Sequence, residues 1–136
     1  MTSNKTDNRI TPSHITMLLP DEIFVFGSNL EGNHAGGAAR TAVQHFGAIM
    51  GIGVGIQGQS YAIPTMQGGA DTIQPYVDEF IQYAAQNPNL YFLVTPIGCG
   101  IAGFNARDIA PLFKNAQNMK NISLPKEFRL ILEGAN

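Results

Sequence analysis

The chain of 136 residues has one cysteine, no tryptophan and few charged residues. A single cysteine, Cys99, excludes an internal disulfide framework and a cysteine-rich zinc site. Charged residues make up 13% of the chain, against about 25% in an average globular domain. Eight Lys and Arg stand against ten Asp and Glu, which gives a formal charge of −2. This balance argues against nucleic acid as a partner, because nucleic-acid binding needs a basic surface.

Long apolar runs are also lacking. The longest, Ala48 to Ile56, is interrupted by glycines and is far shorter than the roughly 20 residues that cross a bilayer. The first residues, Met1 to Asn8, are polar and lack the apolar segment of a secretory signal. The three histidines are scattered and have no metal-ligand spacing. We therefore expect a cytoplasmic protein with no membrane partner, no metal and no cofactor.

The chain does have enough apolar material for a core. Hydrophobic residues make up 44% of the sequence, which excludes disorder as its overall state. The length is typical of one domain. We divide the chain into a polar N-terminal lead-in, residues 1–20, and a single domain, residues 21–136.

The order of apolar patterns predicts an α/β fold. Ile23–Phe26 and Leu90–Val94 lack a polar face, which is typical of strands buried in a parallel sheet. We further predict helices over residues 38–46, 72–85 and 105–115, strands over 60–63 and 128–132, and a glycine-rich loop over 51–58. Alternating strands and helices favour a three-layer α/β/α domain with a mainly parallel central sheet.

Two glycine-rich segments each follow a predicted strand and precede a predicted helix: the first glycine loop, residues 26–38, and the second glycine loop, residues 97–104. In open α/β sheets, ligands bind at the carboxyl ends of the strands. Glycine lets the backbone approach a ligand closely, and a helix N-terminus offers unpaired N–H groups. Neither Asn29–Ala39 nor Phe80–Ala106 contains Lys or Arg. We therefore predict a backbone cradle for a phosphate or pyrophosphate. Alternatively, the glycines only form tight turns.

The second glycine loop also matches the dinucleotide-binding pattern GxGxxG at Gly98, Gly100 and Gly103. That fingerprint requires an acidic residue about 20 positions further on, where this chain has none. A second match begins at Gly53, but Pro64 leaves no room for the helix that must follow. The sequence thus argues against a Rossmann dinucleotide site.

The two glycine loops resemble those of the macro domain family, which binds ADP-ribose and processes ADP-ribose 1″-phosphate. Phe24–Leu30 followed by Gly36–Ala38 is similar to the family's first ligand loop, and Gly100–Phe104 to its diphosphate loop. Ser60–Pro64 is similar to the short strand between them, and the resemblance spans residues 21 to 117. It implies a small, divergent, macro-like domain that binds ADP-ribose or a related phosphorylated nucleoside.

By this resemblance, Asn29 hydrogen-bonds the distal ribose and the glycine loops hold the phosphates. The residues expected to bind the ligand are Gly27, Ser28, Asn29, Gly36, Gly37, Ala38, Gly98, Cys99, Gly100, Ile101, Ala102, Gly103 and Phe104. The chain departs from the family in three ways. It has no acidic residue within 9–20 to read adenine, no aromatic residue at Ala102, and no glutamate pair of the poly(ADP-ribose) glycohydrolase type. We therefore expect weak discrimination among bases.

Catalysis, if present, is expected to be hydrolysis of an ADP-ribose derivative at the ribose or at a phosphate ester. His34 and Asn29 are the candidates to place the attacking water, with Glu31 as a second candidate base. The alternative for His34 is an exposed loop histidine. Cys99 has no readable histidine partner and is a poor candidate nucleophile, whereas Asp108 is best explained as a helix-start residue.

Two further hypotheses remain open at this point. One is a non-catalytic module that binds a nucleotide or a modified protein through the same cleft. The other is an interaction protein whose glycine loops are purely architectural. The ADP-ribose-binding domain, with or without hydrolysis, and the non-catalytic module share a small-molecule nucleotide partner such as ADP-ribose. The sequence does not predict an oligomeric state.

Overall fold

The computed structural model describes residues 2–134, which form a mixed α/β domain. Its strands are β1 (Glu22–Ser28), β2 (Gly55–Gln57), β3 (Ser60–Pro64), β4 (Tyr91–Val94) and β5 (Ile122–Ser123). Its α-helices are α1 (Gly37–His45), α2 (Gln74–Gln86), α3 (Ala106–Ile109) and α4 (Lys126–Leu132). Two 3-10 helices, Ala70–Thr72 and Ala110–Ala116, precede α2 and follow α3.

The five strands form one sheet in the order β2-β3-β1-β4-β5. The pairs β1–β3, β1–β4 and β4–β5 are parallel, and only the edge pair β2–β3 is antiparallel. The expectation of a mainly parallel sheet is therefore confirmed. The strand predicted at 90–94 lies in the interior of the sheet beside β1, which is itself the central strand.

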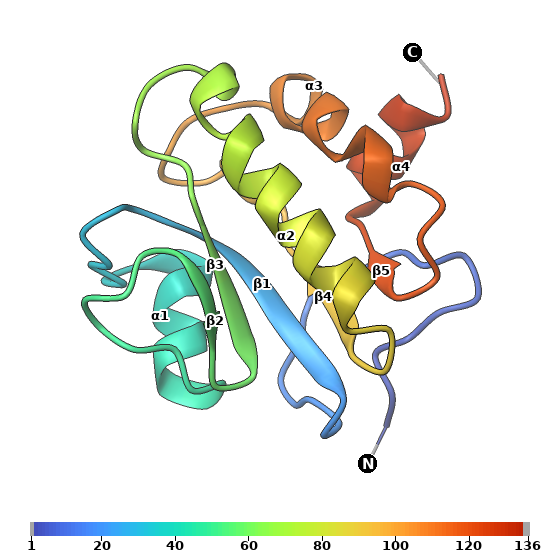
Figure 1. The fold of residues 1–136 in the computed structure, drawn as a ribbon, viewed down its shortest axis with the longest axis horizontal. Helices are drawn as coiled ribbons and strands as arrows, with labels where there is room; N and C mark the ends of the chain where they lie inside the picture. The colour runs from blue at the N-terminus through green and yellow to red at the C-terminus, as the bar shows by residue number, and fades with distance from the viewer. Residues whose placement is uncertain (1, 135–136) are drawn as a thin grey trace.

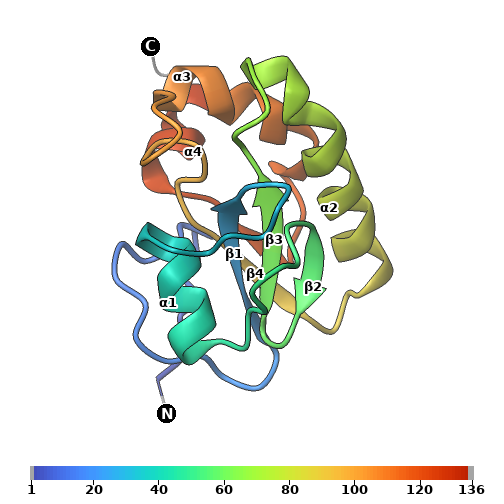
Figure 2. The ribbon, with the colours of Figure 1, turned by 90° about the vertical axis from the view of Figure 1, so that its left-hand side faces the viewer.

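Helices cover both faces of the sheet (Figure 1). Ile23 and Val25 of β1 face the larger core, under α2, α3 and α4. Phe24 and Phe26 face the smaller core, under α1. Figure 2, turned by 90°, shows α1 and α2 on opposite sides of the strands. Burial on both faces explains why this strand has no polar positions in its centre.

The prediction of a strand over residues 128–132 is wrong, because this segment forms the helix α4. Phe128 is fully buried and Leu132 packs against the same core, so the apolar spacing is that of one helix face. The true last strand, β5, has two residues and carries no pattern. The strand β2 was also missed, because it lies within the glycine-rich segment 51–58.

The helix predicted over 105–115 begins where expected but changes type. Asn105 caps α3, its side chain accepting from the Asp108 N–H, and the Asp108 carboxylate accepts from the Asn105 N–H in return. Four residues later the chain continues as a 3-10 helix with Pro111 in its first turn. Proline has no N–H to donate, so the α-helical hydrogen-bond ladder is interrupted there.

Residues 2–20, which we call the N-terminal strap, pack along the domain. Ile10 forms an isolated parallel bridge with Leu124 beside β5, and Ile15 and Leu18 pack against the core under α1. Among the helices of residues 2–134, none combines the length and the apolar character that a membrane crossing requires.

Candidate functional site

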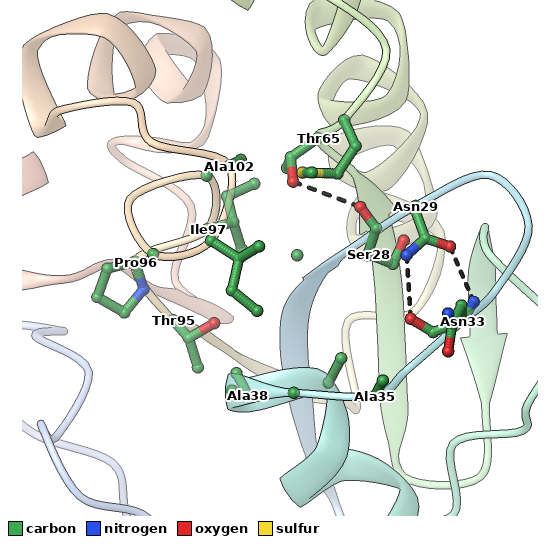
Figure 3. Close-up of a pocket in the computed structure, with 18 residues that line it drawn as sticks. Ser28, Asn29, Asn33, Ala35, Ala38, Thr65, Thr95, Pro96, Ile97 and Ala102 are labelled. Carbon is green, nitrogen blue, oxygen red and sulfur yellow. Dashed lines mark hydrogen bonds between the residues drawn. The ribbon is translucent and has the colours of Figure 1, made fainter.

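The two glycine loops lie at the same edge of the sheet because they follow adjacent parallel strands. Val25 of β1 pairs with Val94 of β4, so the loops that follow these two strands leave the sheet side by side. Between them is the loop pocket, a cavity of about 370 Å³, seen in close-up in Figure 3. Its lining residues are Gly27, Ser28, Asn29, Asn33, Ala35, Gly36, Gly37, Ala38, Ala39, Thr65, Met66, Thr95, Pro96, Ile97, Gly98, Gly100, Ile101 and Ala102.

Most of the residues predicted from the glycine loops line this pocket, but three do not. Cys99, Gly103 and Phe104 are outside the lining. Phe104 and Cys99 pack against the larger core instead, and the N–H of Phe104 donates to the Gly98 carbonyl at 2.8 Å. The second glycine loop therefore turns its last aromatic side chain toward the interior.

Two threonines that sequence reasoning missed complete the pocket. Thr65 follows β3 and Thr95 follows β4, and both strands are parallel neighbours of β1. The Thr95 hydroxyl donates to the Val25 carbonyl at 2.7 Å, and the Thr65 N–H donates to the Ser28 carbonyl at 2.9 Å. Only their position in the chain could have indicated a place in the pocket, because each directly follows the carboxyl end of a parallel strand.

The first glycine loop is ordered by its own side chains. Asn29 Nδ2 donates to the Asn33 carbonyl at 3.0 Å, and Asn29 Oδ1 accepts from the Asn33 N–H at 2.8 Å. The Ser28 hydroxyl donates to the Gly53 carbonyl at 2.6 Å. A Cβ atom on Gly53 would overlap the carbonyl oxygens of Asn29 and Leu30. The segment 51–58 thus packs against the first glycine loop and requires glycine at position 53.

His34 is part of this support. Its side chain is 2% exposed, and its Nε2 lies 2.9 Å from the Ile52 carbonyl oxygen. A carbonyl only accepts, so Nε2 carries the hydrogen. The other nitrogen, Nδ1, is buried and has no partner among the described residues. The ring meets Phe26 edge-on at 5.2 Å between centroids. His34 is buried, not exposed, and lies outside the pocket lining; its catalytic role stays a prediction.

The loop pocket contains no charged side chain among its lining residues in the described part of the chain. Arg40, the cation closest in sequence to the first glycine loop, is exposed on α1 and is not part of the lining. The N-cap of α1, Gly36, provides no side-chain hydrogen bond. The first N–H groups of α1 therefore have neither an intrahelical partner nor a side-chain cap. An anion in this pocket would be held by backbone dipoles.

Cys99 has the properties of a structural thiol. Burial raises the pKa of the Cys99 thiol, and the negative charges of Glu127 and Asp108 raise it further. The group is thus protonated at neutral pH, and the thiol is a poor nucleophile. Residues 2–134 also contain no group of three or more His, Cys, Asp or Glu side chains that could hold a metal ion.

A second cavity, the strap pocket, adjoins the first and has a volume of about 520 Å³. The strap provides residues 12–16, and β1 provides Phe24. The remaining lining residues are Ala38, Thr41, His45, Thr95 and Pro96. Because Ala38, Thr95 and Pro96 also line the loop pocket, the two cavities adjoin at these residues.

Comparisons of the chain with protein-family models, curated proteins and solved structures gave no match.

Proposed function

We propose that this chain is a macro-like domain that binds ADP-ribose or a related phosphorylated nucleoside in the loop pocket. One observation carries the proposal. Two glycine loops from adjacent parallel strands face each other across a pocket that also contains the uncapped N-terminus of α1. Such a site supplies several N–H donors to one anion without a side-chain charge.

The second glycine loop suits a diphosphate because it leaves space. A Cβ atom on Gly100 would meet nothing within 4 Å, so the backbone faces the open pocket there. Gly27 and Gly98 close the floor, where a Cβ atom on Gly27 would lie 3.4 Å from the Gly98 nitrogen. In this proposal the phosphates lie between Gly100 and the first turn of α1, and Asn29 contacts the distal ribose.

The strap pocket suits the nucleoside end of the same ligand. Its lining includes Ile15 and Phe24, against which a flat base can pack, together with several hydroxyl and two imidazole side chains. No carboxylate lines it within the described residues. This composition supports the expectation that an adenine amino group is not specifically read.

The pocket chemistry favours binding over hydrolysis. Among the described residues, none that lines the loop pocket carries a carboxylate or an imidazole. His34 already donates through Nε2 to Ile52, and Glu31 is exposed outside the lining. General-base catalysis needs a base within hydrogen-bond reach of the attacking water. We therefore place the non-catalytic module, which reads a free nucleotide or an ADP-ribosylated protein, ahead of the hydrolase.

Calorimetry with ADP-ribose, NAD, AMP, ADP and ribose 5-phosphate tests the proposal. The expected result is tightest binding of ADP-ribose, and loss of that binding in Gly100→Val. Incubation with ADP-ribose 1″-phosphate and with an ADP-ribosylated protein then distinguishes a hydrolase from a non-catalytic binding module. Release of phosphate or of free ADP-ribose above the rate of a buffer blank would establish a hydrolase. Binding of none of the nucleotides would overturn the proposal.

A further inference from the structure

We propose that Glu22 is a positioning residue for the ligand: it anchors the N-terminal strap, and the anchored strap forms one wall of the strap pocket. The inference rests on the proposed function, which places the nucleoside end of the ligand in that pocket. Glu22 begins β1, at the end of the strand opposite to the glycine loops. It therefore acts on the ligand only through the strap.

The Glu22 carboxylate is fully buried and surrounded by donors from the strap. It accepts from the Leu19 N–H at 2.8 Å, from the Asn4 N–H at 2.9 Å and from Asn4 Nδ2 at 2.9 Å. The Ser3 hydroxyl at 3.3 Å and Lys5 Nζ at 3.2 Å complete the set. Each of these donors lies within residues 3–19, so the carboxylate ties together both ends of the strap.

Burial makes this anchor cooperative. An ionised carboxylate removed from water is costly unless donors replace its hydration. Burial by itself raises the pKa of Glu22, but the hydrogen bonds from Leu19 and Asn4 outweigh it, and the pKa lies below its ordinary value. If the strap moved away, the carboxylate would lose its donors together. The docked strap is therefore the arrangement that the charge favours.

Asn4 connects the anchor directly to the part of the strap that approaches the pocket. Its side-chain Nδ2 donates both to Glu22 Oε1 and to the Met17 carbonyl, the latter at 2.8 Å. Residue 17 follows the pocket-lining segment 12–16 by one position. A change at the carboxylate is thus transmitted to the pocket wall through one side chain.

The wall itself is held mainly by its two flanks. On one flank, the Thr11 N–H donates to the Leu124 carbonyl at 2.9 Å, and the Leu124 N–H donates to the Arg9 carbonyl at 3.1 Å. On the other flank is the Glu22 cluster. Between them, residues 12–16 make no hydrogen bond to the described part of the chain, and Ile15 alone packs against the core under α1. The shape of the wall therefore depends on the anchors.

The test compares two probes in the variant Glu22→Gln. Pyrophosphate fills only the loop pocket, whereas ADP-ribose reaches both pockets. We expect the affinity for ADP-ribose to fall about tenfold, the order expected when a charge-assisted hydrogen bond is lost, and the affinity for pyrophosphate to change less than about twofold. Glu79→Gln, an exposed glutamate on α2, is the matched control and should alter neither affinity.

Asn4→Ala is the second variant, and it keeps the test decisive if Glu22→Gln does not fold. It removes the link to Met17 from a partly exposed position and should produce the same selective loss. In the double variant, the fold-loss of ADP-ribose affinity should be smaller than the product of the fold-losses of the two single variants, because the residues form one network.

A readout without ligand separates this inference from the proposed function. In Glu22→Gln, nuclear Overhauser contacts between the Ile15 methyl groups and the core under α1 should weaken, while those within the sheet persist. Three results in Glu22→Gln would each overturn the positioning role. They are an equal loss of affinity for pyrophosphate and ADP-ribose, an unchanged affinity for ADP-ribose, and unchanged Ile15 contacts. Failure of the wild-type chain to bind either probe would instead overturn the proposed function.

Discussion

The side chain of Ile101 lies against Gly36, so the two glycine loops meet at the mouth of the loop pocket. A Cβ atom added to Gly36 would be 3.2 Å from Ile101 Cδ1. Ile101 is nonetheless 76% exposed and lines the loop pocket. The contact makes Ile101 the apolar edge over which a bound nucleotide would lie.

Ile101→Ala is therefore expected to weaken ADP-ribose binding by about 1 kcal/mol, the value of the apolar surface it removes. Because the side chain is exposed, the free energy of unfolding should change by less than about 0.5 kcal/mol. Calorimetry and urea unfolding measure the two effects. Weaker binding accompanied by an equal loss of stability would show that Ile101 holds the loop and not the ligand.

Gly100→Val should abolish nucleotide binding while the domain stays folded. The added side chain meets no protein atom at its Cβ position and instead fills the space proposed for the phosphate. Gly37→Val should also prevent binding, but it has a φ of +59° and adds a strain of about 1–2 kcal/mol to the folded state. Thermal unfolding separates the two variants.

Arg40→Ala is the control for this pair, since Arg40 is exposed and outside the pocket lining. It should bind nearly as well as the wild-type chain. If Arg40→Ala abolished binding while Gly100→Val bound normally, a side-chain charge would hold the phosphate and the backbone cradle would be excluded.

Asn29→Ala should weaken ADP-ribose binding by roughly 1–2 kcal/mol. The substitution removes the proposed ribose contact and also both hydrogen bonds between Asn29 and Asn33. Asn29→Asp is the matched variant, because its oxygen still accepts from the Asn33 N–H. If Asn29→Asp retained full affinity, the donor Nδ2 would have no part in binding.

The bases should be poorly distinguished. Because no described residue that lines the strap pocket carries a carboxylate, adenine and guanine diphosphoriboses are expected to differ by no more than about 1 kcal/mol, the value of one hydrogen bond. Parallel calorimetric titrations of the two ligands measure the difference. A preference of several kcal/mol would mean that another group, such as His14 or His45, reads the base.

Stability should fall at alkaline pH because of one tyrosine. Burial raises the pKa of Tyr61 to about 12, and the negative charge of Glu79 adds to the effect. In the unfolded chain a tyrosine ionises near pH 10. The unfolded state thus releases its proton first, and about 2 kcal/mol of stability is lost as the pH rises from about 10 to 12.

Tyr61→Phe tests this assignment, because it cannot ionise. Urea unfolding between pH 9 and pH 12 should show a shallower decline for the variant than for the wild-type chain. Parallel declines in the two proteins would assign the alkaline loss to other groups.

The fold could be predicted from sequence where a run of four or five residues was buried on both faces. Ile23–Phe26 and Leu90–Val94 had that property, and both are interior strands. Short elements that depend on tertiary pairing could not be predicted. The two residues of β5 pair with β4, and β2 exists only because Gly55–Gln57 folds back on β3. The five apolar-rich residues of segment 128–132 fit both the two-residue period of a strand and the 3.6-residue period of a helix. Burial of one face of the segment favours the helix.

The site was predictable to the extent that it follows from glycine loops at strand ends. Sequence pattern indicated which loops are close together, but not which way each side chain turns. Phe104 was expected at the ligand and packs into the core. Thr65, Met66 and Thr95 were missed, because only the parallel order of β3, β1 and β4 brings them to the pocket. The contribution of the strap to the strap pocket likewise could not be predicted, since residues 12–16 have no regular hydrophobic pattern.

The absence of charged side chains from the loop-pocket lining within residues 2–134 has a consequence for how binding responds to salt. Ions in solution weaken attraction between charged groups over distances of about 8–10 Å at ordinary ionic strength, but they compete poorly with short hydrogen bonds from enclosed N–H groups. A lysine- or arginine-based phosphate site loses affinity steeply as salt is added. The proposed ligand, like the protein with its charge of −2, is an anion, so added salt would remove a mild mutual repulsion. The affinity for ADP-ribose should accordingly stay constant or rise slightly between low and high sodium chloride.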